Sequence, residues 1–351
     1  MPARTLTTTF RLLYMVLAVW SSAEATAGDS PAGAVDLQRL TSPIVIQGDD
    51  DTGYRDPAVV YHEGMFYLYM TRSTIDTDGL IYNQTAWSKS RDLLHWTEPK
   101  PFTPKDRSKN YSSPGNVIRD GPDFVLCLQT YPTPKTPRPC TEPGAPRWVM
   151  QYGDHTARLW SMRSRDLEHW SEPELIPVKG PDVPQEAMGR LIDPFLLRDK
   201  DDKSRWWCFY KEKGQVRYSW SLDLTTWTPA GVGAGGENPC VIVEGDEYVL
   251  FYSPHTGIGV KRSTDLKTWR DCGVLTLGLD NWDWAKGRLT AGFVLDLRRE
   301  PRVGKALMFF HGSRWPEGDP RGGWANHVSL GIAWSDDLVH WSWPGKVATG
   351  R

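Results

Sequence analysis

Short runs of alternating apolar and polar residues follow one another along most of the chain, with turn residues between them. The segment from Gly53 to Ser73, GYRDPAVVYHEGMFYLYMTRS, has two such runs on either side of the turn sequence HEG. Period-two alternation around a short Gly-containing turn predicts a β-hairpin with one buried face. Four similar hairpins follow, with first strands that begin at SSPGNVIRDG, IDPFLLRDKD, ENPCVIVEGD and AGFVLDLRRE.

A seven-residue repeat, Ser-x-Asp-Leu-x-x-Trp, follows each hairpin after one further alternating run. It occurs at residues 90–96, 164–170, 221–227, 263–269 and 335–341. Its Ser and Asp side chains suit hydrogen bonds to turn amides, and its Leu and Trp suit packing against a neighbouring sheet. Five units of four strands predict an all-β protein, a five-bladed β-propeller with four antiparallel strands per blade and the site at one end of the central axis.

The repeats predict a single domain, residues 42–351, with blades at about 54–101, 111–175, 190–230, 236–276 and 289–345. Each blade is complete in chain order. We therefore expect the ring to close by packing of blade one on blade five, with help from the apolar segment 42–48.

The N-terminal residues have the pattern of a secretory signal peptide, residues 1–27, followed by a linker, residues 28–41. Arginines precede the apolar run 12–20, and a small-residue A-x-A sequence ends at Ala27. The apolar run is too short to span a membrane. We expect a secreted or periplasmic protein that has no membrane association after the signal peptide is cleaved.

Charge and composition narrow the class of partner. The net charge is −2 at pH 7, which gives no reason to expect binding to nucleic acid or to an anionic membrane. A carbohydrate suits this chain better, and its 18 Trp can serve both as core packing and as platforms for sugar rings. Five Cys in an exported chain leave at least one thiol free or paired between molecules. The sequence leaves open whether Cys127 and Cys140 form a disulfide.

Acidic residues begin three of the five innermost strands. Alignment of the blades places these residues together: Asp56-Pro57, Ser113-Pro114, Asp193-Pro194, Glu237-Asn238-Pro239 and Ala291-Gly292. The starts of these strands converge on one end of a propeller, where three carboxyls repel one another, so at least one pKa should be raised. Glycoside hydrolysis needs a carboxylic acid for the leaving oxygen and a carboxylate for water or the anomeric carbon. The residues alone also allow an acid cage for a cation, or Asx turns before proline.

The ordered set Arg-Asp-Pro, Ser-Pro, Ile-Asp-Pro and Glu-Asn-Pro resembles glycoside hydrolase family 43 and its five-bladed relatives, over almost the whole mature chain. These relatives include α-L-arabinofuranosidases, β-xylosidases and arabinanases. The resemblance implies a glycosidase that cleaves arabinose- or xylose-like O-glycosyl bonds in polysaccharide with inversion. Asp56 would be the general base, Glu237 the general acid, and Asp193 would orient the substrate and adjust the pKa of the acid. No cofactor is required, and His311 would stand beside a structural Ca²⁺, as in some relatives.

Loops at the same end of the propeller are expected to surround the acids with substrate-binding side chains. The candidates are Tyr54, Arg55, Tyr111, Arg190, His255, Trp282, Trp284, Arg288 and Trp315. Aromatic rings stack on the apolar faces of sugars, and Arg donates to their hydroxyls. The SSPGN sequence of blade two and Asn238 depart from the family pattern, and they leave the sugar undecided.

Other functions remain open from the sequence. A retaining fructan or furanoside hydrolase of the same clan would share the fold, but the chain lacks its usual Asn-Asp-Pro-Asn motif. A propeller lectin would repeat its binding residues in every blade, whereas the acids differ between blades here. A sialidase would have Gly where the repeat has Leu, and one blade more.

Overall fold

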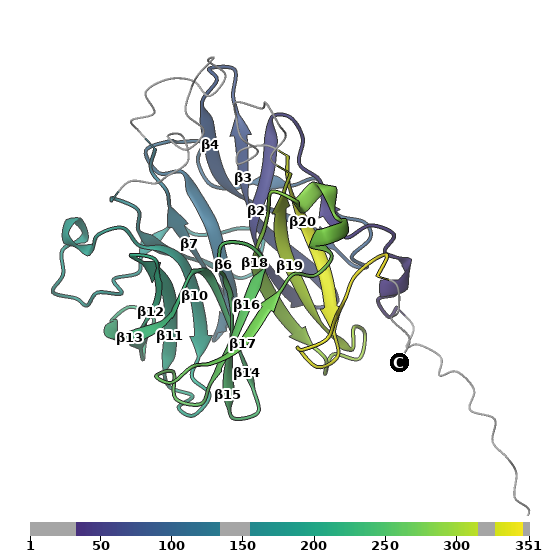
Figure 1. The fold of residues 1–351 in the computed structure, drawn as a ribbon. Helices are drawn as coiled ribbons and strands as arrows, with labels where there is room; N and C mark the ends of the chain where they lie inside the picture. Colours follow the sequence, from purple (N-terminus) through teal and green to yellow (C-terminus); the bar gives the residue numbers. More distant parts are fainter. Residues whose placement is uncertain (1–32, 134–154, 315–326, 347–351) are drawn as a thin grey trace, which may run out of the picture.

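The computed structural model describes residues 33–133, 155–314 and 327–346, so the expected signal peptide lies outside the described residues. Five antiparallel sheets follow one another around a central axis (Figure 1), which confirms the predicted five-bladed β-propeller. Innermost strands of successive blades contact one another, and that of blade five contacts that of blade one. No helix in the described part of the chain has the length and apolar character to cross a membrane.

Each of the first four blades is a four-stranded sheet in chain order. Blade one contains β2 (Thr52–His62), β3 (Met65–Ile75), β4 (Ile81–Ser90) and β5 (Lys100–Pro101). Blade two contains β6 (Tyr111–Asp120), β7 (Asp123–Thr130), β8 (Leu159–Ser164) and β9 (Glu174–Leu175). Blade three contains β10 (Ile192–Arg198), β11 (Trp206–Glu212), β12 (Gln215–Ser221) and β13 (Thr228–Gly235). Blade four contains β14 (Glu237–Glu244), β15 (Glu247–Ser253), β16 (Ile258–Ser263) and β17 (Arg270–Leu275).

Blade five is built from both ends of the described chain. It contains β18 (Arg288–Leu297), β19 (Lys305–Ser313), β20 (Val328–Ser335), β21 (Trp341–Ser342) and β1 (Ile44–Ile46). Both β1 and β21 pair with β20, antiparallel and at different places along it. The segment 42–48 thus takes part in closing the ring as expected, and it does so through backbone hydrogen bonds between β1 and β20, in addition to the packing of blade one on blade five.

The described residues include four short 3₁₀ helices outside the sheets: η1 (Leu37–Arg39), η2 (Gln185–Met188), η3 (Leu279–Asn281) and η4 (Asp283–Ala285). The first of them falls in the expected linker. There Leu37 and Leu40 are buried in the main hydrophobic core. These residues therefore belong to the packed fold and stabilise the closing strand that follows them.

The repeated sequence forms the same kind of turn in all five blades. In blade one, Ser90 Oγ accepts the N–H of Leu93 at 2.9 Å, and Asp92 Oδ1 accepts the next two N–H groups, each at 2.9 Å. The Leu of every repeat has a left-handed backbone with φ of 62–67° and a buried side chain: Leu93, Leu167, Leu224, Leu266 and Leu338. Burial of the side chain offsets a backbone cost of roughly 1–2 kcal/mol for a residue other than Gly.

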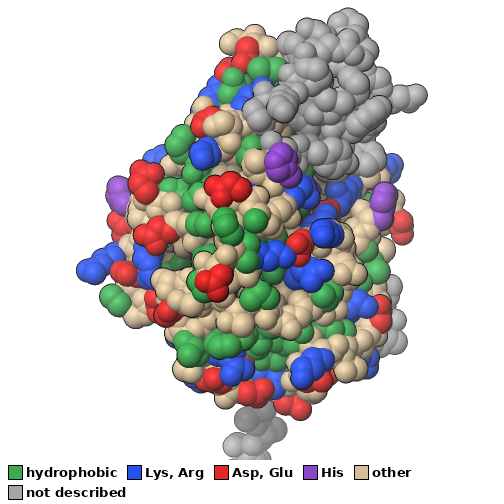
Figure 2. Space-filling model, turned by 90° about the vertical axis from the view of Figure 1, so that its left-hand side faces the viewer, with side chains coloured by type: hydrophobic (Ala, Val, Ile, Leu, Met, Phe, Trp, Pro, Cys, Tyr) green, Lys and Arg blue, Asp and Glu red, His purple; other side chains and the backbone are tan. Residues whose placement is uncertain are grey.

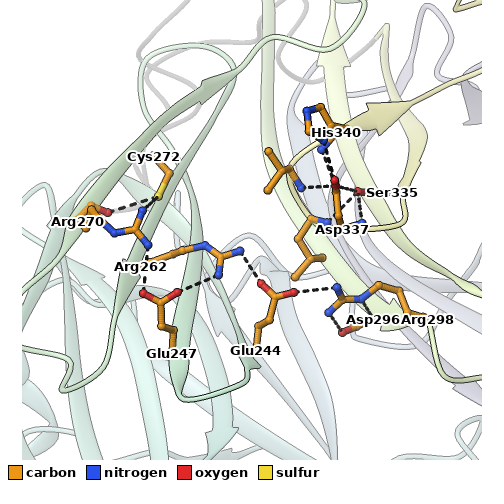
Figure 3. Close-up of polar contacts among 12 residues, drawn as sticks. Glu244, Glu247, Arg262, Arg270, Cys272, Asp296, Arg298, Ser335, Asp337 and His340 are labelled. Atoms are coloured by element: carbon orange, nitrogen blue, oxygen red, sulfur yellow. Dashed lines mark hydrogen bonds and ion pairs between the residues drawn. The ribbon is translucent and has the colours of Figure 1, made fainter. Parts of the chain in front are cut away.

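Charged side chains join the far ends of blades four and five (Figure 3). Glu244 accepts hydrogen bonds from Arg262 at 2.6 Å and from Arg298 at 2.8 Å. Glu247 accepts from Arg262 at 3.0 Å and from Arg270 at 3.2 Å. Isolated surface pairs contribute about 0–1 kcal/mol, but shared partners make this a network. It ties the end of β14 to the turn after β18, at the end of the propeller away from the strand starts.

The outer surface carries charges of both signs. Acidic and basic side chains are interspersed over most of the face in Figure 2, and several Lys and Arg side chains gather right of its centre. The large apolar side chains exposed in the described residues are scattered: Leu222, Val232, Val243, Val274 and Val339. Single exposed apolar residues are ordinary for a globular protein, so this surface does not point to a ligand site.

Four of the five cysteines lie in the described residues, and each has a free thiol. Cys127 is buried, and its thiol donates to Asn116 Oδ1 at 3.3 Å. Burial raises the pKa of Cys127 to about 12, so this thiol is not a nucleophile at neutral pH. Cys140, its candidate partner, lies outside the described residues.

Leu167→Gly tests whether side-chain burial outweighs backbone strain in the repeated turn. The change relieves roughly 1–2 kcal/mol of left-handed backbone cost. It also removes a side chain that is 0% exposed, and truncation of such a Leu costs about 2–5 kcal/mol. We expect a net loss of about 1–3 kcal/mol in the free energy of unfolding in urea.

Lys213→Gly is the matched control, because Lys213 is also left-handed, with φ of 50°, but its side chain is exposed. We expect its stability to be equal to or above that of the unchanged protein. Equal stability of the Leu167→Gly and Lys213→Gly variants would show that burial of the repeat Leu is not what maintains the turn.

Candidate active site

The five innermost strands share one backbone irregularity near their starts. The pairing of each with its second strand shifts register there, as at a β-bulge. One residue of each bulge is left-handed, with φ of 41–55°: Asp56, Ser113, Asp193, Asn238 and Ala291. These are the residues that align in the sequence. Because a bulge bends a strand and re-aims its side chains, it presents these positions at the end of the axis.

The N–H group of each bulge residue donates to a side chain of another blade. Four acceptors occupy the same position, on the second strand of the preceding blade, opposite the residue before the bulge. They are Thr71 Oγ1 for Ser113 (2.7 Å), Gln129 Oε1 for Asp193 (2.6 Å), Ser253 Oγ for Ala291 (2.8 Å) and His311 Nδ1 for Asp56 (3.1 Å). Adjacent blades are thus linked at the site by a ring of side-chain acceptors.

Blade three breaks this pattern. Its equivalent residue is Lys211, opposite Ile192, and an ammonium group has no acceptor to offer. The N–H of Asn238 donates instead to Asp193 Oδ2 at 3.2 Å. Lys211 forms an ion pair with Glu237. In blade three, the ammonium of Lys211 and the carboxyls of Asp193 and Glu237 therefore lie together.

A cavity of about 420 Å³ lies over the strand starts. Asp56, Asp193 and Glu237 line it from three different blades. The axis beneath is almost filled, because only a void of about 30 Å³ remains among the inner strands. Packing there is so close that a Cβ on Gly115 would lie 1.6 Å from the carbonyl oxygen of Pro194. The cavity thus has a closed floor.

The structure brings eight of the predicted site residues to this cavity: Arg55, Asp56, Arg190, Asp193, Glu237, His255, Arg288 and His311. It does not bring Tyr54 and Tyr111 there, whose side chains are buried in the hydrophobic clusters. Trp315 lies outside the described residues. The carboxyls and the predicted Arg residues therefore assemble, whereas Tyr54 and Tyr111 do not join them.

Trp282 and Trp284 also lie away from the carboxyls. Trp282 stacks on Phe310 with ring centroids 5.6 Å apart, and Trp284 stacks on the same ring at 6.0 Å. Both line a second cavity of about 340 Å³ beside the residues of β1. Their place in the fold is the packing of blade five.

Several lining residues were not predicted from the sequence: Ser112, Gln129, Tyr131, Ile192, Lys211 and Thr290. Ser113 and Asn238 were aligned with the acids but were given no role. A signal for two of them was present, because Gln129 and Lys211 stand near the ends of the second strands, in the same column as Thr71 and His311. An alignment of second strands would have found that column.

Asp56 is held by neutral donors. Its Oδ2 accepts from the hydroxyls of Thr71 at 2.9 Å and Ser113 at 3.0 Å. His311 Nδ1 lies 3.7 Å from Oδ1. Burial lowers the pKa of His311 to about 4, against the opposing effect of the Asp56 charge, so the ring is neutral at pH 7. Since Nδ1 accepts the Asp56 N–H, the ring proton is on Nε2, and the carboxylate is fixed in position.

Asp193 and Glu237 have pKa values shifted in opposite directions. Burial, together with the charge of Glu237, raises the pKa of Asp193 to about 7. Burial also raises the pKa of Glu237, but the charges of Lys211 and Arg288 outweigh it and lower that pKa overall. Both cations form ion pairs with the Glu237 carboxylate. Below about pH 7 the site thus holds a proton on Asp193 beside an ionised Glu237.

His311, expected beside a structural Ca²⁺, has one ring nitrogen engaged, and the Ca²⁺ itself stays a prediction. The Nδ1 of His311 is occupied by the Asp56 N–H. No group of three or more His, Cys, Asp and Glu side chains in the described residues is arranged to hold a metal ion. We derive no chemical step through a metal.

Comparisons with solved structures agree on the architecture. A thermostable family-43 glycoside hydrolase aligns with a TM-score of 0.56 and 15% identity, over 89% of this chain and 97% of that one. An arabinanase from Bacillus subtilis aligns with 0.56 and 14%, over 84% and 99%. The catalytic domain of a family-62 α-L-arabinofuranosidase from Coprinopsis cinerea aligns with 0.57 and 14%, over 81% and 90%.

The chain has the five-bladed fold of these hydrolases. No protein-family model matches the sequence, and no curated protein matches it either. At identities of 13–16% the likeness extends to the fold, and the chemistry rests on the cavity itself.

Asp193→Asn tests the raised pKa through stability. The pKa of Asp193 is about 7 in the fold against a reference value of 3.8. The folded state therefore binds more protons than the unfolded state between these values, and stability falls as pH rises from about 4 to 7. Asn carries no charge, so we expect the Tm of the variant to exceed that of the unchanged protein by roughly 2–6 °C at pH 8, and to equal it near pH 4.

Asp223→Asn is the control of opposite sign. The N–H groups of Thr226 and Thr225 lower the pKa of Asp223, so its charge stabilises the fold at neutral pH. We expect this variant to be less stable than the unchanged protein at pH 8. A lower Tm for Asp193→Asn at pH 8 would show that Asp193 is ionised and stabilising, against the assignment made here.

Proposed function

We propose that the protein is a secreted glycoside hydrolase that cleaves arabinose- or xylose-like glycosidic bonds in polysaccharide or oligosaccharide by an inverting acid–base mechanism. One observation carries the proposal: three carboxyls from three blades line one closed-floor cavity, and their surroundings move two of the pKa values apart. The separation keeps a proton on one carboxyl of the site while a neighbouring carboxyl is ionised, and acid–base hydrolysis needs such a stored proton. The N-terminal signal pattern supports export.

The base in this proposal is Asp56. Its Oδ2 is oriented by two hydroxyls, and its backbone is fixed by the hydrogen bond to His311. A carboxylate held in this way takes a proton from water as the water oxygen attacks the anomeric carbon. The neutral His311 adds no charge that would compete for the carboxylate.

The acid in this proposal is the Asp193–Glu237 pair. Asp193 stores the proton, and Glu237 receives it and passes it to the leaving oxygen as the glycosidic bond breaks. Glu237 gains the proton when the substrate weakens its contacts with Lys211 and Arg288. That proton then leaves with the alcohol product. Asp56 takes up one proton from the attacking water, so the three carboxyls hold one proton in total both before and after the reaction.

The arabinanase and arabinofuranosidase activities named for the structural neighbours favour a pentose substrate. The closed floor fits one terminal sugar ring held over the carboxyls, since a cavity of about 420 Å³ is in the range of small-molecule sites. We therefore place the bond to be cleaved at the level of Asp56 and Glu237.

Asp56→Asn and Glu237→Gln test the assignment directly. Loss of the general base or the general acid lowers the rate roughly 10²- to 10⁴-fold. We expect kcat to fall by that amount for aryl arabinofuranosides or xylosides, while circular dichroism and Tm show a folded protein. The anomer first formed, followed by NMR, should be inverted.

Asp283→Asn serves as the control, because Asp283 is exposed and pairs with Lys286 outside the main cavity. Its activity should equal that of the unchanged protein. Full activity of Glu237→Gln would remove Glu237 from the chemistry. A retained anomer would make Asp56 a nucleophile and replace inversion by a retaining mechanism.

The stored proton also predicts a pH profile. Because the pKa of Asp193 is about 7, the pair loses its proton as the pH rises through 7. We expect kcat/KM to fall above about pH 7, and Asp193→Asn to lose this dependence together with most of its activity. A profile that stays flat to pH 9 in the unchanged protein would exclude Asp193 as the proton store.

A further inference from the structure

Among the described residues that line the cavity, cationic side chains outnumber carboxyls. Four residues with positive side chains line it: Arg55, Arg190, Lys211 and Arg288. Three carboxyls stand against them, and one of the three is protonated below about pH 7. A site for a neutral sugar needs donors and acceptors but no surplus of positive charge, so this balance bears on the choice of substrate.

The positive residues differ in how their charge is balanced. Lys211 and Arg288 form ion pairs with Glu237. Arg55 donates from Nη2 to Ser73 Oγ at 3.0 Å and, at 3.5 Å, to Asn83 Oδ1, and both acceptors are neutral. Its Nε is buried and has no hydrogen-bond partner. No carboxylate in the described part of the chain forms an ion pair with Arg55.

The neighbouring carboxylate does not supply the missing charge. Asp56 Oδ2 accepts from Thr71 and Ser113, and the Asp56 N–H donates to His311. Asn83 Oδ1 is already bound by the Ser73 hydroxyl at 2.6 Å. A partly buried guanidinium without a counter-charge is costly, and an anion from a ligand would remove that cost. The planar guanidinium fork of Arg55 suits a carboxylate as that anion.

The described cavity lining has little aromatic surface on which a neutral ring could stack. Tyr131 contributes a phenol ring to this lining. The guanidinium of Arg190 lies over that ring, 5.3 Å from its centroid. Trp282 and Trp284 are committed to blade five. Recognition by the described part of the lining therefore relies on charge and hydrogen bonds.

We propose that the sugar bound beside Asp56 is a uronic acid, and that Arg55 binds its carboxylate. A uronic acid pyranose is a xylose-like ring with a carboxylate on C5, so it keeps the ring of the proposed substrate and adds the anion. This inference rests on the proposed glycosidase function for the position of the ring, but the anion site itself can be tested by binding alone.

The first test compares matched ligands. Binding of glucuronate, galacturonate, glucose, galactose and xylose to the full mature chain is measured by calorimetry, with inorganic sulfate and a sulfated sugar as further anions. We expect a uronate to bind roughly 10- to 100-fold more tightly than its neutral parent sugar, and more tightly than sulfate. Equal binding of uronate and parent sugar would overturn the proposal, and tightest binding of the sulfated sugar would replace the carboxylate by a sulfate.

The second test uses variants of Arg55. Arg55→Gln should abolish the preference for the uronate, and Arg55→Lys should keep part of it, since Lys keeps the charge without the fork. Arg165→Gln is the control, because Arg165 is a surface residue that pairs with Asp123. It should leave the preference unchanged. A preference that survives in Arg55→Gln would assign it to another residue, against the proposal.

Hydrolysis assays test this inference and the proposed function separately. Aryl uronides of both anomers are compared with aryl xylosides and arabinofuranosides. We expect a higher kcat/KM for a uronide, and for Arg55→Gln a rise in KM that is larger on the uronide than on the neutral substrates. Hydrolysis of neutral glycosides without any preference for uronides would overturn the inference alone. Arg55-dependent uronate binding without turnover of any glycoside would overturn the proposed hydrolysis and leave the anion site in place.

Discussion

The hydrogen bond between each bulge residue and a side chain of another blade is the interaction on which the site depends. The bulge turns its residue toward the axis, but it also leaves a backbone N–H without a ladder partner, and such a group must be satisfied when buried. Thr71, Gln129, Ser253 and His311 satisfy it in four blades. One contact thus supports the strand start and fixes the angle between neighbouring blades.

The chemistry arises where this arrangement changes. A Lys at the acceptor position of blade three cannot take the N–H, so the Asn238 N–H turns to Asp193 and the Lys turns to Glu237. This single substitution in a repeated frame brings an ammonium, an ionised carboxylate and a protonated carboxyl together. Lys211, together with Arg288, lowers the pKa of Glu237, whereas burial and the charge of Glu237 raise the pKa of Asp193.

The sequence predicted what short local patterns determine. The Ser-x-Asp-Leu-x-x-Trp turns and the X-Pro strand starts each lie within a few residues, so counting them was enough for the blade number and for the three acids. It did not predict the roles of segments whose partners are distant. Trp282 and Trp284 lie in a polar-looking loop, but their rings meet Phe310 on β19. The apolar segment 42–48 was expected to help close the ring, but no local pattern shows that its strand β1 pairs with β20.

The hydrogen bonds at the bulges also allow the residues that link the blades to be distinct from those that set the charge of the cavity. All five inner strands use the same backbone geometry, and the left-handed position holds Asp, Ser, Asn or Ala. The blade-to-blade hydrogen bonds require only an N–H and an acceptor, so the bulge side chains are free to differ. Arg55 stands one residue before such a position and Glu237 before another, opposite Thr71 and Ser253. Exchange of residues in these columns would change the charge of the cavity without changing how the blades are linked.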